Sequence, residues 1–286
     1  MAPWFRGRFS VLVYDLYPEA LKANGFSESG FLYRWWAGRN RKLFGEAHRV
    51  YTLSDTMKSG IEKYCPGRDI IVIPNWSAFS HLAPVRKEDN KILDREGLAG
   101  RFIVQYSGNI GVTHNVETLI EVAEYLKGEN EIVFQIIGRG ERRNEIARRI
   151  HEKALGNCIL MPFRNDGDLF ESLCAADLAV IILDDRTPDV SIPSKLYNIM
   201  SASLPVMAIA SSGSGLAEMV VSHNIGEVFD KNDVKGMSHF ILDLKNNRSR
   251  WTMFSANSLE ASSLYTSENA AKYLEEIGRA SCRERV

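Results

Sequence analysis

The fold class is decided by residues 102–140, which read FIVQYSGNIGVTHNVETLIEVAEYLKGENEIVFQIIGRG. The apolar runs at 102–106 and 132–137 are typical of strands that are buried on both faces. Between these runs, apolar residues recur along 116–126 at the spacing of one helix face. A strand, a one-faced helix and a second strand predict two parallel strands joined by a right-handed crossover.

The same alternation extends in both directions along the chain, and it predicts an α/β protein built on parallel sheets. Further strands are expected at 9–14, 50–53, 70–73, 178–183 and 206–209.

The periodicity of apolar residues also divides the chain into two domains. It vanishes after Trp76, a polar stretch follows, and a new strand begins at Phe102. We expect a first domain at 1–97 and a second at 98–258, with a separate helical segment at 259–277. The first domain offers too few strands for a complete doubly wound sheet, so we expect it to be N-terminally truncated. Residues 278–286 resemble a translated sequencing adaptor, the alternative being a natural basic tail.

Composition and charge exclude several classes of protein. Hydrophobic residues make up 45% of the chain and charged residues 25%, and the formal net charge is −1. These values argue against disorder and against nucleic acid as a partner. The sequence shows no apolar run of the ~20 residues that a membrane span needs, and no leader. Its cysteines and histidines lack metal-ligand spacing, so we expect neither a zinc site nor a disulfide framework, but free thiols in a reducing cytoplasm.

The turn that follows the strand at 102–106 is the first of three candidate phosphate sites. Ligands of open α/β sheets bind beyond the carboxyl ends of the strands, where helix N-termini attract anions. Gly108 and Gly111 let the backbone approach a ligand closely, and Asn115 can cap the next helix. An ordinary tight turn could use the same residues.

The second candidate is the turn Gly138-Arg139-Gly140, which follows the strand at 132–137. It resembles the start of a dinucleotide fingerprint, but Arg143 stands where the third glycine belongs. No acidic residue ends the next strand either, so a nicotinamide cofactor is not expected.

The third candidate places Pro193, Ser194 and Lys195 at the start of a predicted helix. A cation in the first turn opposes the helix dipole, at a cost of about 0.3–1 kcal/mol. Either Lys195 is a surface residue that tolerates this penalty, or it faces an anionic partner. A diphosphate would supply that partner, since lysine binds phosphate as a point charge.

Several short motifs occur in a fixed order along the chain. They are YDLYPE at 14–19, YTLS at 51–54, VIPNW at 72–76, YSGNIG at 106–111, IIGRG at 136–140, AADLAV at 175–180, PSKLY at 193–197 and LPV at 204–206. Their order and spacing resemble glycosyltransferases of the GT-B fold, family 4 type, of the kind that builds bacterial surface polysaccharides. The resemblance extends from about Val11 to Ile277.

The resemblance implies two Rossmann-like domains, of which the second holds a nucleotide-sugar donor and the first presents the acceptor. It implies that the helix at 259–277 returns to the first domain and that no metal is needed. It also implies a hexosyl-type transfer of EC class 2.4, with retention at the anomeric carbon.

The resemblance assigns roles to individual residues. Lys195 and the backbone of the Gly108 turn would carry the leaving phosphate, and Ser194 would donate to it, because preorganised donors at a developing oxyanion lower the barrier. Pro162 and Phe163 would lie against the base. The other donor-binding residues that it implies are Asn109, Gly111, His114, Gly138, Gly140 and Asn198. No general base is named, because its position lies in the part expected to be missing.

The chain departs from the family pattern in two places. Many relatives carry a pair of glutamates near the third turn, where this sequence has Val190 and Asn198. Asn198 can still hydrogen-bond a hydroxyl group. Asn109 and His114 stand where many relatives place arginine and lysine.

Three functions stay open. The first is transfer of a sugar from a nucleotide-sugar donor to a polysaccharide or lipid-linked acceptor, and we expect these 286 residues not to turn over alone. The second is a donor-binding partner subunit without turnover, and the third is a nucleotide-sugar epimerase.

Between Phe31 and Lys42, aromatic and basic residues mix. We favour a helix there that packs Trp35 and Trp36 into the first domain; the alternative is peripheral contact with the cytoplasmic membrane.

Overall fold

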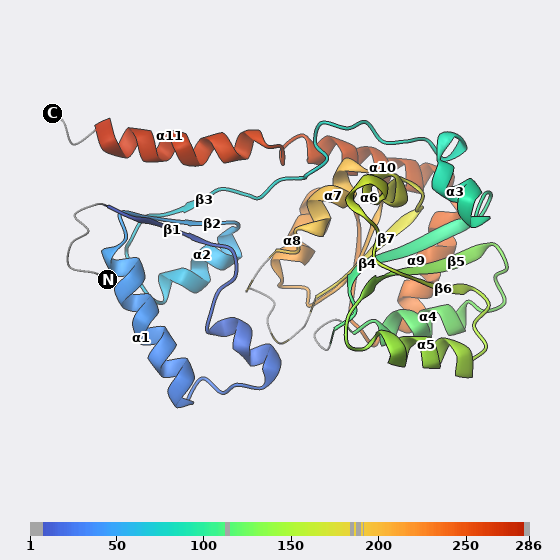
Figure 1. Cartoon of the computed structure of the whole chain (residues 1–286), viewed down its shortest axis with the longest axis horizontal. Helices are drawn as coiled ribbons and strands as arrows, with labels where there is room; N and C mark the ends of the chain where they lie inside the picture. The colour runs from blue at the N-terminus through green and yellow to red at the C-terminus, as the bar shows by residue number, and fades with distance from the viewer. Residues whose placement is uncertain (1–7, 112–114, 184–185, 187–189, 191, 283–286) are drawn as a thin grey trace. The chain divides into compact units, whose positions relative to one another are not determined.

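The computed structural model describes residues 8–111, 115–183, 186, 190 and 192–282, which form two compact units (Figure 1). Unit 1 draws on Met1–Asn75, Arg186–Ile192 and Glu268–Val286, and unit 2 on Trp76–Asp185 and Pro193–Ser267. Every strand pair in both units is parallel, which confirms the predicted α/β class.

Unit 1 carries a three-stranded sheet in the order β1-β2-β3. Its strands are β1 (Ser10–Val13), β2 (Arg49–Thr52) and β3 (Ile70–Val72), and its helices are the 3₁₀ helix η1 (Glu19–Asn24), α1 (Phe31–Glu46), α2 (Asp55–Glu62) and α11 (Glu268–Cys282). Fully buried Val50, Met57 and Ile61 pack in its core. The last helix contacts the sheet of this unit, because the ring of Tyr273 meets Tyr51 of β2 edge-on at 5.3 Å.

Unit 2 carries a six-stranded sheet in the order β6-β5-β4-β7-β8-β9. Its strands are β4 (Phe102–Asn109), β5 (Ile132–Arg139), β6 (Cys158–Met161), β7 (Leu178–Ile182), β8 (Val206–Ile209) and β9 (Gly226–Phe229). The chain leaves β4 toward β5 and β6, then returns to the other side of β4 as β7. The point where the order reverses is where open α/β sheets bind their ligands.

Helices surround the sheet of unit 2, with α4 beside α5 and α9, and α10 beside α7 and α9 (Figure 1). They are the 3₁₀ helix η2 (Lys87–Asp89), α3 (Lys91–Glu96), α4 (Glu117–Tyr125), α5 (Arg143–Glu152), α6 (Asp166–Cys174), α7 (Lys195–Ser201), α8 (Gly215–Ser222), α9 (Val234–Asn246) and α10 (Arg248–Ser262). Side-chain caps fix several of their starts, for example Asn165 of α6 and Ser214 of α8.

The structure assigns residues from Trp76 onward to unit 2, whereas the sequence predicts a boundary at residue 97. The polar stretch is not a free linker. Ser77 N donates to Tyr265 O at 2.9 Å, and Lys87 pairs with buried Asp177 at 2.5 Å. These contacts attach the stretch to the second sheet.

The boundary expected after residue 258 falls inside a helix, because α10 runs from Arg248 to Ser262. Its serines are not loop residues: Ser255 donates to Ser203 O at 2.7 Å and Ser258 to Leu204 O at 2.6 Å. The final helical segment, expected to end at residue 277, continues to Cys282 and so enters the segment interpreted as a tail. Alanine and arginine in that segment are good helix formers.

The two tryptophans of α1 differ in their surroundings. Trp36 stacks on Tyr17 at 5.2 Å, as the packing interpretation expects. Trp35, one residue earlier and about 100° away around the helix, is 50% exposed. Only one of the two rings is packed into unit 1.

Candidate functional site

A cavity of about 390 Å³ opens in unit 2 at the carboxyl end of β4, beside the segment that leads into α7. This is the place where the strand order reverses. It is lined by Ser107, Gly108, Asn109, Phe163, Leu169, Leu173, Pro193, Ser194, Lys195, Asn198 and Ile199. The first and third candidate turns therefore meet at one cavity. Among the described lining residues there is one cation and no carboxylate.

Lys195 is the first residue of α7, as the sequence predicts, and its ammonium nitrogen is buried. Among the described residues this nitrogen has no hydrogen-bond partner. Burial lowers the pKa of Lys195 from 10.5 to about 8, because a low-dielectric surrounding disfavours the charged form. A buried, unpaired ammonium group is costly, and an anion in the cavity would remove that cost.

Tyr106 on β4 supports the ammonium group. The Nζ atom of Lys195 lies 4.6 Å from the centroid of the Tyr106 ring, within the range of a cation–π contact. The hydroxyl of the same ring donates to the carbonyl oxygen of Asn109 at 2.6 Å. One buried side chain thus connects the first turn to the lysine of the third. Sequence reasoning missed Tyr106, because a tyrosine in an apolar strand looks like a core residue.

The glycines of the first two turns have different surroundings. A Cβ atom at Gly108 would lie 3.0 Å from the ammonium nitrogen of Lys195, so the missing side chain leaves room for that group. Cβ atoms at Gly138 and Gly140 would instead overlap the carbonyl oxygens of Gly108 and Ile110. The second turn therefore holds the backbone of the first turn against β5, and Gly138 and Gly140 do not line the cavity.

The other predicted residues are placed as follows. Gly111 and Pro162 do not line the cavity, and His114 lies outside the described residues. Asn115 does not cap α4, whose N-cap position is Val116; its amide donates to the Thr118 hydroxyl at 3.1 Å. Ser194 is exposed at the start of α7, and its hydroxyl makes no capping hydrogen bond.

Asn198 lines the cavity, but its side-chain oxygen is already used. It accepts hydrogen bonds from the Ser77 hydroxyl at 3.1 Å and from Ala78 N at 3.0 Å. The amide nitrogen is the group that Asn198 can offer to a ligand. Val190, the other departure from the family pattern, is buried in unit 1, where its carbonyl oxygen accepts from Leu16 N at 3.0 Å.

Phe163 lines the cavity from the short loop between β6 and α6. Its ring is 48% exposed, and the guanidinium carbon of Arg139 lies 5.4 Å from the ring centroid. An exposed aromatic ring at a cavity can stack on a planar ligand.

Among the described residues, no cluster of three or more histidine, cysteine, aspartate or glutamate side chains has metal-binding geometry. None of the described helices is long and apolar enough to cross a bilayer.

Comparison with known proteins identifies the family. Residues 89–260 match the family described as glycosyl transferases group 1. The chain belongs to this family. It is 24% identical over 239 residues to "Probable glycosyltransferase WbjE" of Pseudomonas aeruginosa, covering 82% of this chain and 59% of that protein. It is 28% identical over 174 residues to WcaI of Escherichia coli (strain K12), which is named for colanic acid biosynthesis, covering 59% of this chain and 42% of that protein.

Solved structures share the fold of this family member. HepE of Anabaena, solved with UDP and glucose, superposes with a TM-score of 0.76 at 16% identity, covering 96% of this chain and 72% of HepE. WaaG, involved in lipopolysaccharide biosynthesis, superposes with a TM-score of 0.72 at 17% identity, covering 91% of this chain and 72% of WaaG. The predicted GT-B architecture is confirmed. The chain spans about half the length of the two curated relatives.

Proposed function

We propose that unit 2 binds a nucleotide-sugar donor and that the protein transfers its sugar, a hexose, to a polysaccharide or lipid-linked acceptor with retention. The observation that carries this proposal is the buried ammonium group of Lys195, which is unpaired among the described residues and faces a cavity at the sheet's switch point. A diphosphate is the anion that a nucleotide-sugar would bring there. The HepE structure, which contains UDP and glucose, supports this class of ligand.

The chemistry follows from charge. Breaking the bond between the sugar and the diphosphate leaves negative charge on a phosphate oxygen, and a fixed cation near that oxygen lowers the barrier. Lys195 supplies the cation, and the exposed Ser194 hydroxyl can donate a hydrogen bond. Because Gly108 has no side chain, its backbone can approach the diphosphate closely. A bound dianion would raise the pKa of Lys195 again, since an opposite charge favours the protonated form.

The remaining cavity residues fit the other parts of the donor. The half-exposed ring of Phe163 offers a stacking surface for the base. The Asn198 amide nitrogen can donate to a ribose or sugar hydroxyl.

A second function, a partner subunit that binds the donor without turnover, has one observation in its favour. The Asn198 oxygen, at a position where many relatives have glutamate, is occupied by Ser77 and Ala78. The site therefore presents no acceptor from that residue to the sugar.

One assay separates the two functions. The protein is incubated with radiolabelled UDP-glucose and a panel of other nucleotide-sugars, together with lipid-linked and glycan acceptors, while calorimetry measures donor binding. Transfer of label to an acceptor supports the first function. Donor binding without transfer for every pair supports the second, and no binding of any nucleotide-sugar contradicts both.

We also propose that α1 contacts a membrane that carries the acceptor. Its outer surface exposes Phe31 (85%) and Trp35 (50%) among basic residues. The basic residues are Arg34, Arg39, Arg41 and Lys42, all of them exposed. Aromatic rings interleaved with cations suit the interface of an anionic bilayer.

A further inference from the structure

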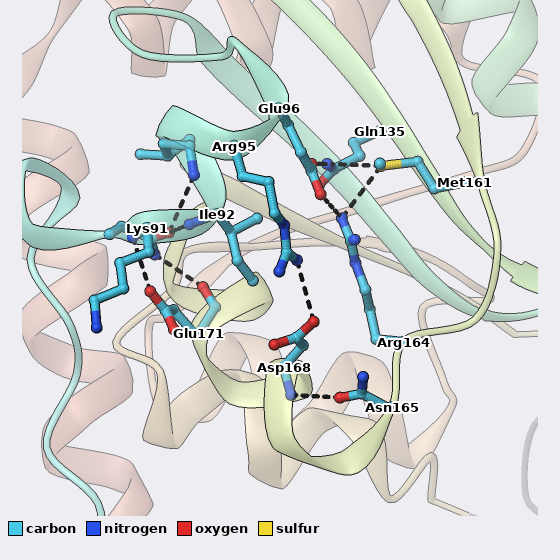
Figure 2. A network of polar contacts seen from close by, with 12 residues as sticks. Lys91, Ile92, Arg95, Glu96, Gln135, Met161, Arg164, Asn165, Asp168 and Glu171 are labelled. Carbon is cyan, nitrogen blue, oxygen red and sulfur yellow. Dashed lines mark hydrogen bonds and ion pairs between the residues drawn. The ribbon is translucent and has the colours of Figure 1, made fainter.

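Helix α3 is held along α6 by a series of polar contacts, which Figure 2 shows from close by. At its start, Lys91 N donates to the Glu171 carboxylate at 2.8 Å. In the middle, Arg95 pairs with Asp168 at 3.1 Å, and this pair is largely exposed. These contacts fix α3 against the helix that carries two residues of the cavity lining.

The last residue of α3, Glu96, makes a different kind of contact. Its Oε1 atom lies 2.5 Å from the guanidinium group of Arg164, and each of the two side chains is only 10% exposed. Its Oε2 atom accepts a hydrogen bond from Gln135 at 2.8 Å (Figure 2). A buried ion pair contributes little net stability, because desolvation offsets the attraction. A role in arranging the structure is the better explanation of such a pair.

Gln135 connects Glu96 to further buried polar groups on β4 and α6. Its side-chain oxygen accepts from the amide of Gln105 at 2.7 Å, and Gln105 also donates to Ser172 O at 2.8 Å. Both glutamines are almost completely buried. These hydrogen bonds restrict the two glutamines and Glu96, as buried polar networks do, although Arg164 Nε has no hydrogen-bond partner among the described residues. Glu96 is thus anchored to β4, β5 and α6 together.

Arg164 connects this buried network to the loop between β6 and α6. Its guanidinium group also contacts the sulfur of Met161 at 3.2 Å, so one side chain holds both residues that flank 162–163 (Figure 2). Asn165 follows directly and caps α6 by accepting from Asp168 N at 2.8 Å. Phe163 is therefore carried on a loop that is fixed on both sides, while its own ring stays half-exposed at the cavity.

We propose that Glu96 and Arg164 are positioning residues that hold the Phe163 ring at the cavity rim so that a nucleobase can stack on it. This inference rests on the proposed donor site. It explains which residues give that site its affinity for the base. On the proposed function Lys195 binds the diphosphate, so the two ends of a nucleotide depend on different residues of the cavity lining. Disturbing the Glu96–Arg164 pair should weaken binding of the base and leave binding of the phosphates unchanged.

The experiment compares UDP with inorganic pyrophosphate, which has no base, by calorimetry on the whole chain. Glu96→Gln should weaken UDP binding about tenfold, the order of magnitude of one base–aromatic stacking contact, and leave pyrophosphate binding within about twofold. Phe163→Ala should do the same. Arg95→Gln is the matched control, because it breaks an exposed ion pair between α3 and α6 and should change neither affinity.

Other results would overturn the inference. Equal weakening of UDP and pyrophosphate would show that the pair only maintains the fold of unit 2, and unchanged UDP binding would show that the pair does not position Phe163. If Glu96→Gln fails to fold, the double variant Glu96→Gln/Arg164→Gln, which leaves no unpaired charge, replaces it with the same expected outcome. If the unmodified protein binds neither ligand, the donor site itself is wrong and this inference is lost with it.

Discussion

The ammonium nitrogen of Lys195 lies 4.6 Å from the centroid of the Tyr106 ring, and the hydroxyl of that ring donates to Asn109 O at 2.6 Å. The aromatic ring takes the place that a carboxylate would fill in an ordinary buried ion pair. A ring holds a cation in place and leaves its charge largely uncompensated. Lys195 is therefore positioned without being neutralised, which suits a group that has to receive an anion.

Replacement of Lys195 by methionine should change stability and affinity in opposite directions. Lys195→Met removes a buried ammonium group that is unpaired among the described residues, so the free energy of unfolding should rise by about 1–3 kcal/mol at neutral pH. The same change should weaken UDP binding by about 1.5–3 kcal/mol, the size of a hydrogen bond to a charged group. Urea unfolding and calorimetry measure the two effects. A loss of stability would contradict the geometry, and unchanged affinity would remove Lys195 from the site.

The stability of the protein should also depend on pH through Lys195. The native group loses its proton near pH 8, whereas the unfolded chain keeps it up to about 10.5. Between these values the unfolded state binds more protons, so the free energy of unfolding rises with pH by about 3 kcal/mol. The variant Lys195→Met lacks this rise. The difference between the urea midpoints of the variant and of the unmodified protein should therefore shrink between about pH 8 and 10.5. A constant difference would mean that Lys195 titrates at its ordinary pKa.

Binding of the donor should show the reverse dependence. A diphosphate needs the protonated ammonium group, so UDP affinity should fall as pH rises above about 8. Near this pH the complex should take up a proton. Calorimetry in two buffers with different ionisation enthalpies measures that uptake, and identical binding heats in both buffers would contradict it.

Two substitutions at Tyr106 separate the roles of its ring and its hydroxyl. Tyr106→Phe keeps the ring beneath Lys195 but loses the bond to Asn109 O, so we expect a loss of about 0.5–1.5 kcal/mol of stability and little change in UDP affinity. Tyr106→Leu also removes the cation–π contact and should lower the pKa of Lys195 further. The pH dependence of UDP binding reports that pKa. The hypothesis fails if both variants show the same pH profile.

The sequence allowed most of the fold of unit 2 to be predicted, because its strands are continuous apolar runs such as 102–106 and 132–137. Short or polar helices and strands were not predicted. β9 reads GEVF at the sheet edge, and α3 has only Ile92 and Leu93 as buried residues. The boundary expected at residue 258 falls inside α10, because Ser255 and Ser258 resemble loop residues, whereas in the structure they donate to the carbonyl oxygens of Ser203 and Leu204, which lie between α7 and β8.

The candidate site was predictable where a residue lies in a strand-to-helix turn, as Gly108 and Asn109 do, or where it violates a local rule. Lys195 could be identified because a cation in the first turn of a helix opposes the dipole. Tyr106 and Glu96 violate no local rule, so neither could be identified. The partner of Glu96 is Arg164, 68 residues away along the chain, and only the folded sheet brings the two together.

The packing role of Gly138 gives a test of the second turn. Gly138→Ala would place a methyl group against the Gly108 carbonyl oxygen, which belongs to a neighbouring strand and cannot move freely. We expect a loss of about 1–3 kcal/mol, as for other overpacked sites. Gly128→Ala is the control, since a Cβ atom there meets nothing within 4 Å, and it should be neutral or stabilising by about 0.4–1 kcal/mol. Equal effects on urea unfolding would rule out the close contact.

The exposed face of α1 gives the last prediction. The protein should bind vesicles that contain phosphatidylglycerol and not vesicles of phosphatidylcholine alone, because four cations interleave with the aromatic rings. Each cation near such a surface contributes about 1 kcal/mol, so Arg39→Gln should weaken vesicle binding about fivefold. Trp35→Ser should weaken it as well and abolish the blue shift of tryptophan fluorescence that insertion produces. Val221→Ser changes another exposed apolar residue, on α8, which is 68% exposed, and should have no effect. Binding that ignores lipid charge, or that Trp35→Ser leaves intact, would show that α1 does not touch the bilayer.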